Sequence, residues 1–117
     1  MASSLKSYVR TYRRLHALSQ DELALLVGLK RGSSISSLER RGSVPSAPVL
    51  IALAYVFAVP IEDVFPVYYE QVTHAVESRA DALYEALQGH PGPDASAKLD
   101  LLESIIRRAS SAKRTTV

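Results

Sequence analysis

The 117-residue sequence contains no cysteine, which excludes disulfides, thiolate metal sites and a cysteine nucleophile. The three histidines, His16, His74 and His90, are too widely spaced to suggest a zinc site, and we expect neither a metal nor another cofactor. Aromatic residues are also few, with six tyrosines, two phenylalanines and no tryptophan. Any hydrophobic core must therefore be mostly aliphatic.

Long apolar runs are missing as well. The longest nearly uncharged stretch, residues 47–61, is shorter than the about 20 residues that a membrane span requires. The N-terminal residues lack the apolar segment of a signal peptide, so we expect a cytoplasmic protein without membrane contact. With 47% hydrophobic and 22% charged residues, the chain can bury the core of one compact domain with an appendage.

The net charge of +2 is the sum of three unlike segments. Residues 1–60 carry eight lysines and arginines against three acids, and residues 61–97 carry seven acids against one arginine. Residues 98–117 carry five bases against two acids. This segregation favours a first half that faces a polyanion and a second half with another role, although solvated helices can acquire such a split by chance.

Apolar residues at spacings of three and four predict short helices throughout the first half of the chain. The predicted helices cover residues 5–17, 20–27, 32 or 33 to 41, 47–61 and 61–65. Ser19 and Glu22 have the spacing of a capping box, and Gly28 and Gly42 are placed to end helices. No strand pattern is present, so we predict an all-α fold.

The helix predicted over residues 47–61 has Ser46 as its cap and tolerates Pro48 in its first turn. Because it is apolar on most sides, we expect other helices to surround it. Beyond Pro66, two longer amphipathic helices are predicted, one to Gln88 and one that Asp94 caps. They are separated by a segment rich in glycine and proline over residues 89–93.

Two short helices joined by a tight turn describe a helix-turn-helix, whose second helix enters the DNA major groove. Ala24 allows the two helices to cross, Gly28 turns the chain, and Ile35 anchors the second helix in the core. The surrounding sequence, LSQDELA from Leu18, ISSLERR from Ile35 and AVPIEDVF from Ala58, closely resembles the phage-repressor or Xre type of helix-turn-helix domain. This resemblance covers residues 5–65 and implies a five-helix lambda-repressor-like bundle that binds double-stranded DNA.

The resemblance also implies roles for individual residues. The positions that match the base-reading face are Lys30, Arg31, Ser33 and Ser37. The positions that match phosphate contacts are Ser19, Gln20, Ser34, Arg40 and Arg41. Arg13 and Glu39 match a structural ion pair between the first helix and the recognition helix. The alternative for Ser33, Ser34, Ser36 and Ser37 is an ordinary solvated helix surface.

One feature departs from the family pattern. Between Gly28 and Ile35 the chain has one more residue than usual, and the extra position lies within residues 30–33. The turn or the first residue of the recognition helix must differ as a result, and Gly32 is the residue most able to accommodate the change. Which side chains reach bases therefore stays open, and DNA shape and water can contribute to recognition.

The C-terminal extension, residues 66–110, is predicted to mediate dimerisation, and residues 111–117 are predicted to form a flexible basic tail. The apolar stripe assigned to the dimer interface consists of Tyr69, Val72, Val76, Leu83, Leu87, Leu99, Leu102, Ile105 and Ile106. A bundle that is already complete cannot cover this stripe, so a second copy is the favoured partner. The alternatives are another protein or a monomer whose extension folds back on the bundle.

These features favour a sequence-specific DNA-binding transcription regulator, a dimeric repressor that occupies an inverted-repeat operator. The first alternative is a protein-interaction module, such as an antitoxin whose C-terminal helices bind a partner protein. An enzyme is disfavoured, because the sequence shows no nucleophile–base pair, metal cluster or phosphate-binding glycine loop.

Overall fold

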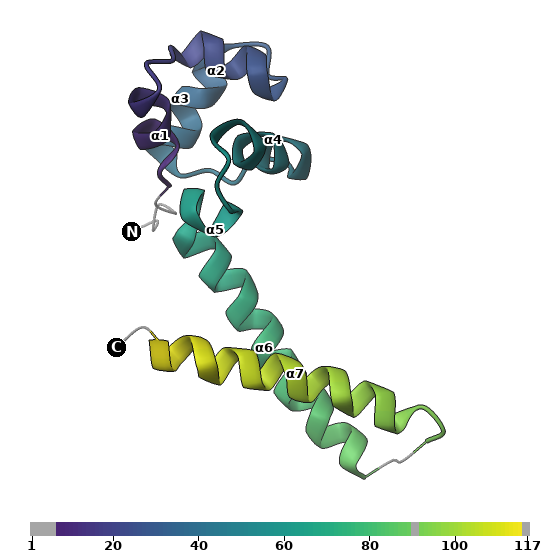
Figure 1. Ribbon diagram of the computed structural model, residues 1–117. Helices are drawn as coiled ribbons and strands as arrows, with labels where there is room; N and C mark the ends of the chain where they lie inside the picture. Colours follow the sequence, from purple (N-terminus) through teal and green to yellow (C-terminus); the bar gives the residue numbers. More distant parts are fainter. Residues whose placement is uncertain (1–6, 90–91, 116–117) are drawn as a thin grey trace. The chain divides into compact units, whose positions relative to one another are not determined.

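The computed structural model describes residues 7–89 and 92–115. Over these residues the protein is all helical, with seven helices and no strand, which confirms the predicted fold class. The chain divides into two units, residues 1–71 and 72–117 (Figure 1). The division falls a few residues beyond the boundary predicted at residue 65, because the first turn of the long sixth helix packs with the bundle through Tyr68.

The first unit contains the five short helices that the sequence predicts. They are α1 (Val9–Leu15), α2 (Gln20–Val27), α3 (Gly32–Arg41), α4 (Ala47–Phe57) and α5 (Ile61–Val64). Two are shorter than predicted. α1 ends before residue 17, because Ala17 adopts a left-handed conformation with φ 58°, and α4 ends before residue 61, because Ala58 does the same with φ 55°.

One apolar cluster holds the five helices together. Each helix contributes a side chain that is at most 1% exposed: Val9, Leu23, Ile35, Leu53 and Val64. The cluster is aliphatic apart from a few rings, of which Tyr12 and Phe57 stack with centroids 5.5 Å apart. The Tyr8 N–H donates to the Val64 carbonyl over 2.8 Å and joins the first helix to the fifth. The bundle is therefore closed on itself, in the arrangement that the family resemblance implies.

α4 differs from its prediction in two ways. Its buried side carries Val49, Leu53 and Phe57, but on the opposite side Ile51 is 63% exposed and Tyr55 is 86% exposed. The expectation that other helices surround α4 is therefore wrong, because the small bundle has neighbours for only one side of this helix. Ser46 is the N-cap residue, as predicted, but its side chain makes no capping hydrogen bond.

The helix-turn-helix forms as the sequence predicts. The Ser19 hydroxyl accepts from the Glu22 N–H over 3.0 Å and the Ser19 N–H donates to the Glu22 carboxylate over 2.8 Å, which completes the capping box of α2. Gly28 ends α2 with φ 82°, in the left-handed region that glycine tolerates best. Gly42 ends α3 in the same way.

The second unit is formed by α6 (Pro66–Gln88), beyond its first turns, and α7 (Ala95–Thr115). α7 continues past Ser110, so residues 111–115 of the predicted tail are helical, and residues 116–117 lie outside the described residues. The helix continues because no proline or glycine interrupts the chain between Ala95 and Thr115. Among the described residues of this unit, Ala80 and Leu102 are the buried ones.

Candidate nucleic-acid interface

The predicted base-reading residues lie at and beyond the N-terminus of α3. Arg31 is the N-cap residue of this helix in an extended conformation, and it is exposed, as are Lys30, Ser33 and Ser34. Ser37 is half-buried one turn further along. Ile35 and Leu38 fix the opposite side of α3 in the core. The helix thus presents a short polar surface whose two cations stand at the end where recognition helices meet base edges.

The predicted phosphate-binding residues are not all equally available. Arg40 and Arg41 are exposed in the last turn of α3, and Ser34 is exposed in its first turn. The Ser19 hydroxyl accepts within the capping box, and its backbone and side-chain hydrogen bonds hold the pKa of the Glu22 carboxyl below its usual value. Ser19 stands at the N-terminus of α2, where the helix dipole favours a bound anion.

The predicted ion pair between Arg13 and Glu39 is present. Arg13 donates from Nε to Glu39 Oε2 over 2.6 Å and from Nη2 to Glu39 Oε1 over 3.1 Å, and a third guanidinium nitrogen donates to the Leu18 carbonyl. The Gln20 amide also donates to Glu39 over 3.2 Å. These contacts join α1, α2 and α3 at one point. The Gln20 amide, which was predicted to bind phosphate, is hydrogen-bonded to Glu39.

The ionisation of this pair follows from its surroundings. The side chains of Arg13 and Glu39 are 12% and 3% exposed. Burial alone would raise the pKa of Glu39, but the hydrogen bonds from Arg13 and Gln20 and the nearby arginine charges outweigh burial and hold it below its usual value. The hydrogen bond to Glu39 raises the pKa of Arg13. Both partners are therefore charged at neutral pH.

Asp21 makes a contact with Gly32 that the sequence did not reveal. Its carboxylate accepts from the Gly32 N–H over 3.0 Å, so α2 supplies a cap for the first residue of α3. Gly32 is buried, and a Cβ there would overlap the Asp21 carboxylate and approach the Asp21 backbone nitrogen to 3.0 Å. The absence of a side chain at Gly32 is therefore what lets the start of α3 lie this close to α2. An acid in a neighbouring helix is too common a feature for sequence reasoning to have paired the two.

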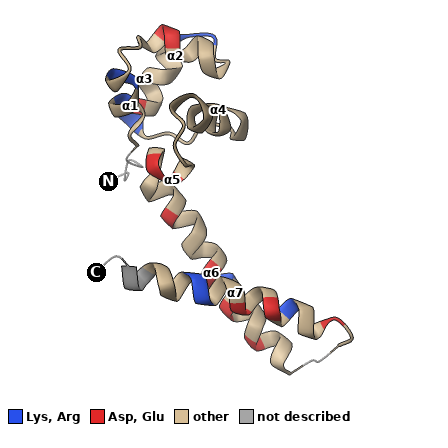
Figure 2. Ribbon diagram, in the orientation of Figure 1, with Lys and Arg blue, Asp and Glu red and all other residues tan. Residues whose placement is uncertain are grey.

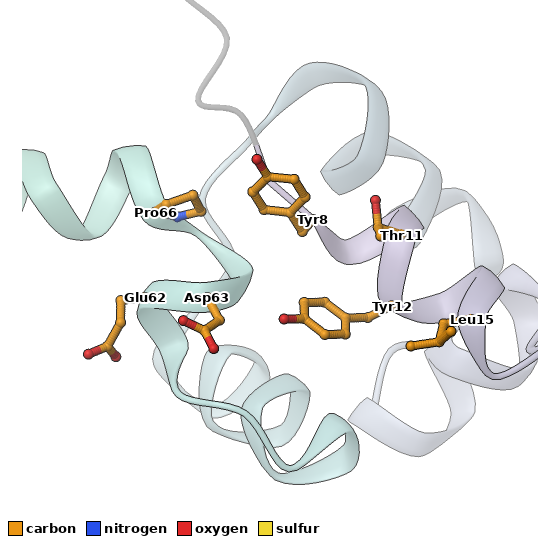
Figure 3. Close-up of a pocket in the computed structure, with 7 residues that line it drawn as sticks. All are labelled: Tyr8, Thr11, Tyr12, Leu15, Glu62, Asp63 and Pro66. Atoms are coloured by element: carbon orange, nitrogen blue, oxygen red, sulfur yellow. The ribbon is translucent and has the colours of Figure 1, made fainter. Parts of the chain in front are cut away.

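α1 separates two pockets of opposite character. One, of about 340 Å³, lies towards α3 and is lined chiefly by arginines. The other, of about 440 Å³, is shown in Figure 3. It is lined by Tyr8, Thr11, Tyr12, Leu15, Glu62, Asp63 and Pro66. Its two carboxylates, Glu62 and Asp63, would repel a phosphate group, whereas the arginines of the first pocket would attract one.

Charge is distributed accordingly over the first unit. Basic residues lie on α1, on the connection before α3 and at the end of α3, whereas α4 carries no charged residue (Figure 2). Of the described residues, no group of three histidines or acids is placed to hold a metal ion. The described part of the chain also contains no helix that is long and apolar enough to cross a membrane.

The predicted dimerisation residues differ widely in exposure. On α6, Tyr69, Val72, Val76 and Leu83 are between 42% and 50% exposed, and Leu87 is half-buried. On α7, Leu102 is buried, whereas Leu99, Ile105 and Ile106 are half-buried. Much of the predicted apolar stripe on α6 and α7 is therefore exposed.

Comparison with known proteins points to one family. The sequence profile of a family described as Helix-turn-helix matches residues 9–64, the span from the start of α1 to the end of α5. An HTH-type transcriptional regulator of Methanocaldococcus jannaschii is 36% identical over 61 residues, which are 52% of this chain and 91% of that protein. The family match ends before α6 begins, so it does not extend over α6 or α7.

Proposed function

Because this chain belongs to the Xre-type helix-turn-helix family, it is a DNA-binding transcription regulator, and we propose that it acts as a dimeric repressor. In this proposal the protein occupies an inverted-repeat operator, α3 enters the major groove, and the bound protein blocks a promoter. Such a role places the protein with the DNA in the cytoplasm. It requires binding and no chemical step.

The observation that carries the proposal is the polar face of α3, a helix whose position is fixed by its contacts with the rest of the bundle. Ile35 and Leu38 anchor the helix in the core, and Asp21 fixes its first residue. Lys30 and Arg31 precede the helix with exposed side chains, and a paired guanidinium contact to guanine is worth about 1–3 kcal/mol of discrimination. We assign base reading to Lys30, Arg31, Ser33 and Ser37. We assign phosphate contacts to Ser19, Gln20, Ser34, Arg40 and Arg41.

The exposed apolar residues of α6 and α7 support the dimer in this proposal. The apolar residues of α6 and α7 that stay accessible need cover, and a second copy offers the same surface in return. A dimer would present two α3 helices and double the number of phosphate contacts, which raises affinity for a palindromic site.

The test is selection of bound duplexes from a random-sequence library at about 50 mM and about 200 mM salt. We expect an enriched inverted repeat and affinity that falls as salt rises. Arg31→Ala should relax the sequence preference, whereas Arg41→Ala should weaken binding to all sequences and flatten the salt dependence. Without an enriched site or a salt effect, the proposed function is wrong. Equal losses of preference in both variants would overturn the assigned roles.

A second candidate function rests on the same accessible apolar residues of α6 and α7. They could bind a different protein, as in an antitoxin, while the bundle binds DNA. Light scattering on the purified chain separates the two possibilities. A dimer at micromolar concentration supports self-association, whereas a monomer that forms a one-to-one complex with a protein encoded beside it supports the antitoxin.

A further inference from the structure

The arginine-lined pocket beside α1 collects side chains from three helices. It has a volume of about 340 Å³. Its lining consists of Arg10, Arg13 and Arg14 from α1, Gln20 from α2, and Ser36, Glu39 and Arg40 from α3. Four guanidinium groups thus meet a single carboxylate at the junction between α1 and the recognition helix.

That carboxylate is already engaged. Glu39 accepts two hydrogen bonds from Arg13 and one from Gln20, so its charge is balanced by Arg13. Among the described residues, no acidic oxygen lies within 4.0 Å of the guanidinium groups of the other three arginines. Like charges gathered in one pocket repel each other, which is unfavourable unless an anion joins them. Arg10 also attracts Glu39 over a longer distance, but none of the three arginines is held in an ion pair with another described residue, so all three remain available to an anion.

We infer that Arg10, Arg14 and Arg40 bind a phosphate group of the DNA backbone beside the recognition helix. The inference rests on the proposed function, and it assigns to α1 a role in DNA binding. Arg10 and Arg14 stand one turn apart on the same face of α1, and Arg40 approaches from the last turn of α3. A guanidinium group presents paired donors that match the oxygens of a phosphate.

The position of the pocket agrees with the geometry of groove binding. When a recognition helix lies in the major groove, the backbones that border the groove pass along its flanks. Ser36 lines the pocket on the flank of α3, one turn before Arg40. The Arg13–Glu39 pair lies on the inner side of the pocket and fixes α1 against α3, so the two helices approach the backbone as one rigid surface.

The test measures how affinity depends on salt for the double variant Arg10→Gln, Arg14→Gln. The probes are two fluorescent duplexes, one with the selected operator and one with random sequence. Each lost phosphate contact should lower the slope of log affinity against log salt by about 0.9, so the double variant should lose up to about 1.8. Binding at about 0.1 M salt should weaken roughly tenfold per lost contact on both duplexes, without a change in sequence preference.

Two further variants serve as controls. Arg10→Lys, Arg14→Lys keeps both charges and should keep the slope, although paired donation is lost. Arg107→Gln, Arg108→Gln removes two adjacent exposed arginines from α7 and should leave the slope unchanged. Thermal unfolding of every variant checks that the bundle is intact. We expect little change in the unfolding temperature, because glutamine favours helix as arginine does.

The slopes of the wild-type chain and the two double variants distinguish a failure of this inference from a failure of the proposed function. A wild-type chain that binds duplex DNA, together with an unchanged slope in the α1 double variant, overturns this inference and leaves the proposed function in place. An equal loss of slope in the α7 double variant also overturns it, because the effect would then reflect total charge instead of the pocket. A wild-type chain that binds neither duplex overturns the proposed function and this inference with it.

Discussion

The two units of the chain have apolar residues in similar patterns but bury them to different degrees. In the bundle, side chains from all five helices form one cluster, and each helix contributes a residue that is at most 1% exposed. In the described part of the second unit, only Ala80 and Leu102 are buried. The comparison shows that a helical stripe alone does not reveal whether its cover comes from the same chain or from another molecule.

The largest effect is expected from the core of the bundle. Leu53→Ala should lower the free energy of unfolding by about 2–5 kcal/mol, because Leu53 is fully buried and truncation leaves a cavity. Ile51→Ala on the exposed side of α4 should cost less than about 1 kcal/mol. Urea denaturation followed by circular dichroism measures both. Equal losses would mean that the outer side of α4 is covered in solution, and the contrast between the units would then weaken.

The second unit should respond through association. Val76→Asp places a charge in the accessible apolar stripe and should weaken the proposed dimer at least tenfold, because an unpaired charge is costly to bury. Ser78→Asp, on the opposite side of α6, is the matched control and should leave the dimer unchanged. Light scattering over a concentration series reports the dissociation. If Val76→Asp stays as dimeric as the control, the interface lies elsewhere on the chain.

The Arg13–Glu39 pair should make the bundle sensitive to acid. The pKa of Glu39 is below its ordinary value in the folded protein, so the folded state binds fewer protons than the unfolded state as pH falls. Its stabilising effect is fully present above the unfolded pKa of about 4.5 and is lost as pH falls through the folded value.

The variant that tests this is Glu39→Gln. It should lower stability at pH 7 by about 1–3 kcal/mol, because Arg13 loses a charged partner, and it should flatten the decline between about pH 5 and pH 3. Urea denaturation over that pH range provides the measurement. An acid-induced decline that is the same in both proteins would assign it to other carboxyl groups.

Local chemistry explains which parts of the fold could be predicted from the sequence. The capping box of Ser19 and Glu22 and the glycine that ends α2 depend on neighbours within a few residues, and both were predicted correctly. The Arg13–Glu39 pair was available from the family resemblance. By contrast, the contact of Asp21 with Gly32 depends on how two helices meet, which no local pattern records.

The same reasoning applies to helix ends and exposure. The exposed side of α4 was missed because its sequence is apolar throughout, and only the small size of the bundle leaves Ile51 and Tyr55 without neighbours. The ends of α1 and α4 were missed because alanine, a strong helix former, occupies the left-handed position after each helix. The assigned DNA contacts and the dimer remain predictions.

The smallest effect should come from these alanines. Ala58 has φ 55° and ends α4, and a left-handed conformation costs a non-glycine residue roughly 1–2 kcal/mol. Ala58→Gly removes this strain but gives the unfolded chain more freedom, so we expect a net gain of about 0.5–1 kcal/mol. Ala52→Gly, inside the same helix, should instead lose about 1 kcal/mol. Thermal and urea unfolding should therefore give shifts of opposite sign for the two substitutions. A loss in both would mean that the strain at Ala58 is relieved in solution, and that α4 continues further towards residue 61 than the left-handed turn allows.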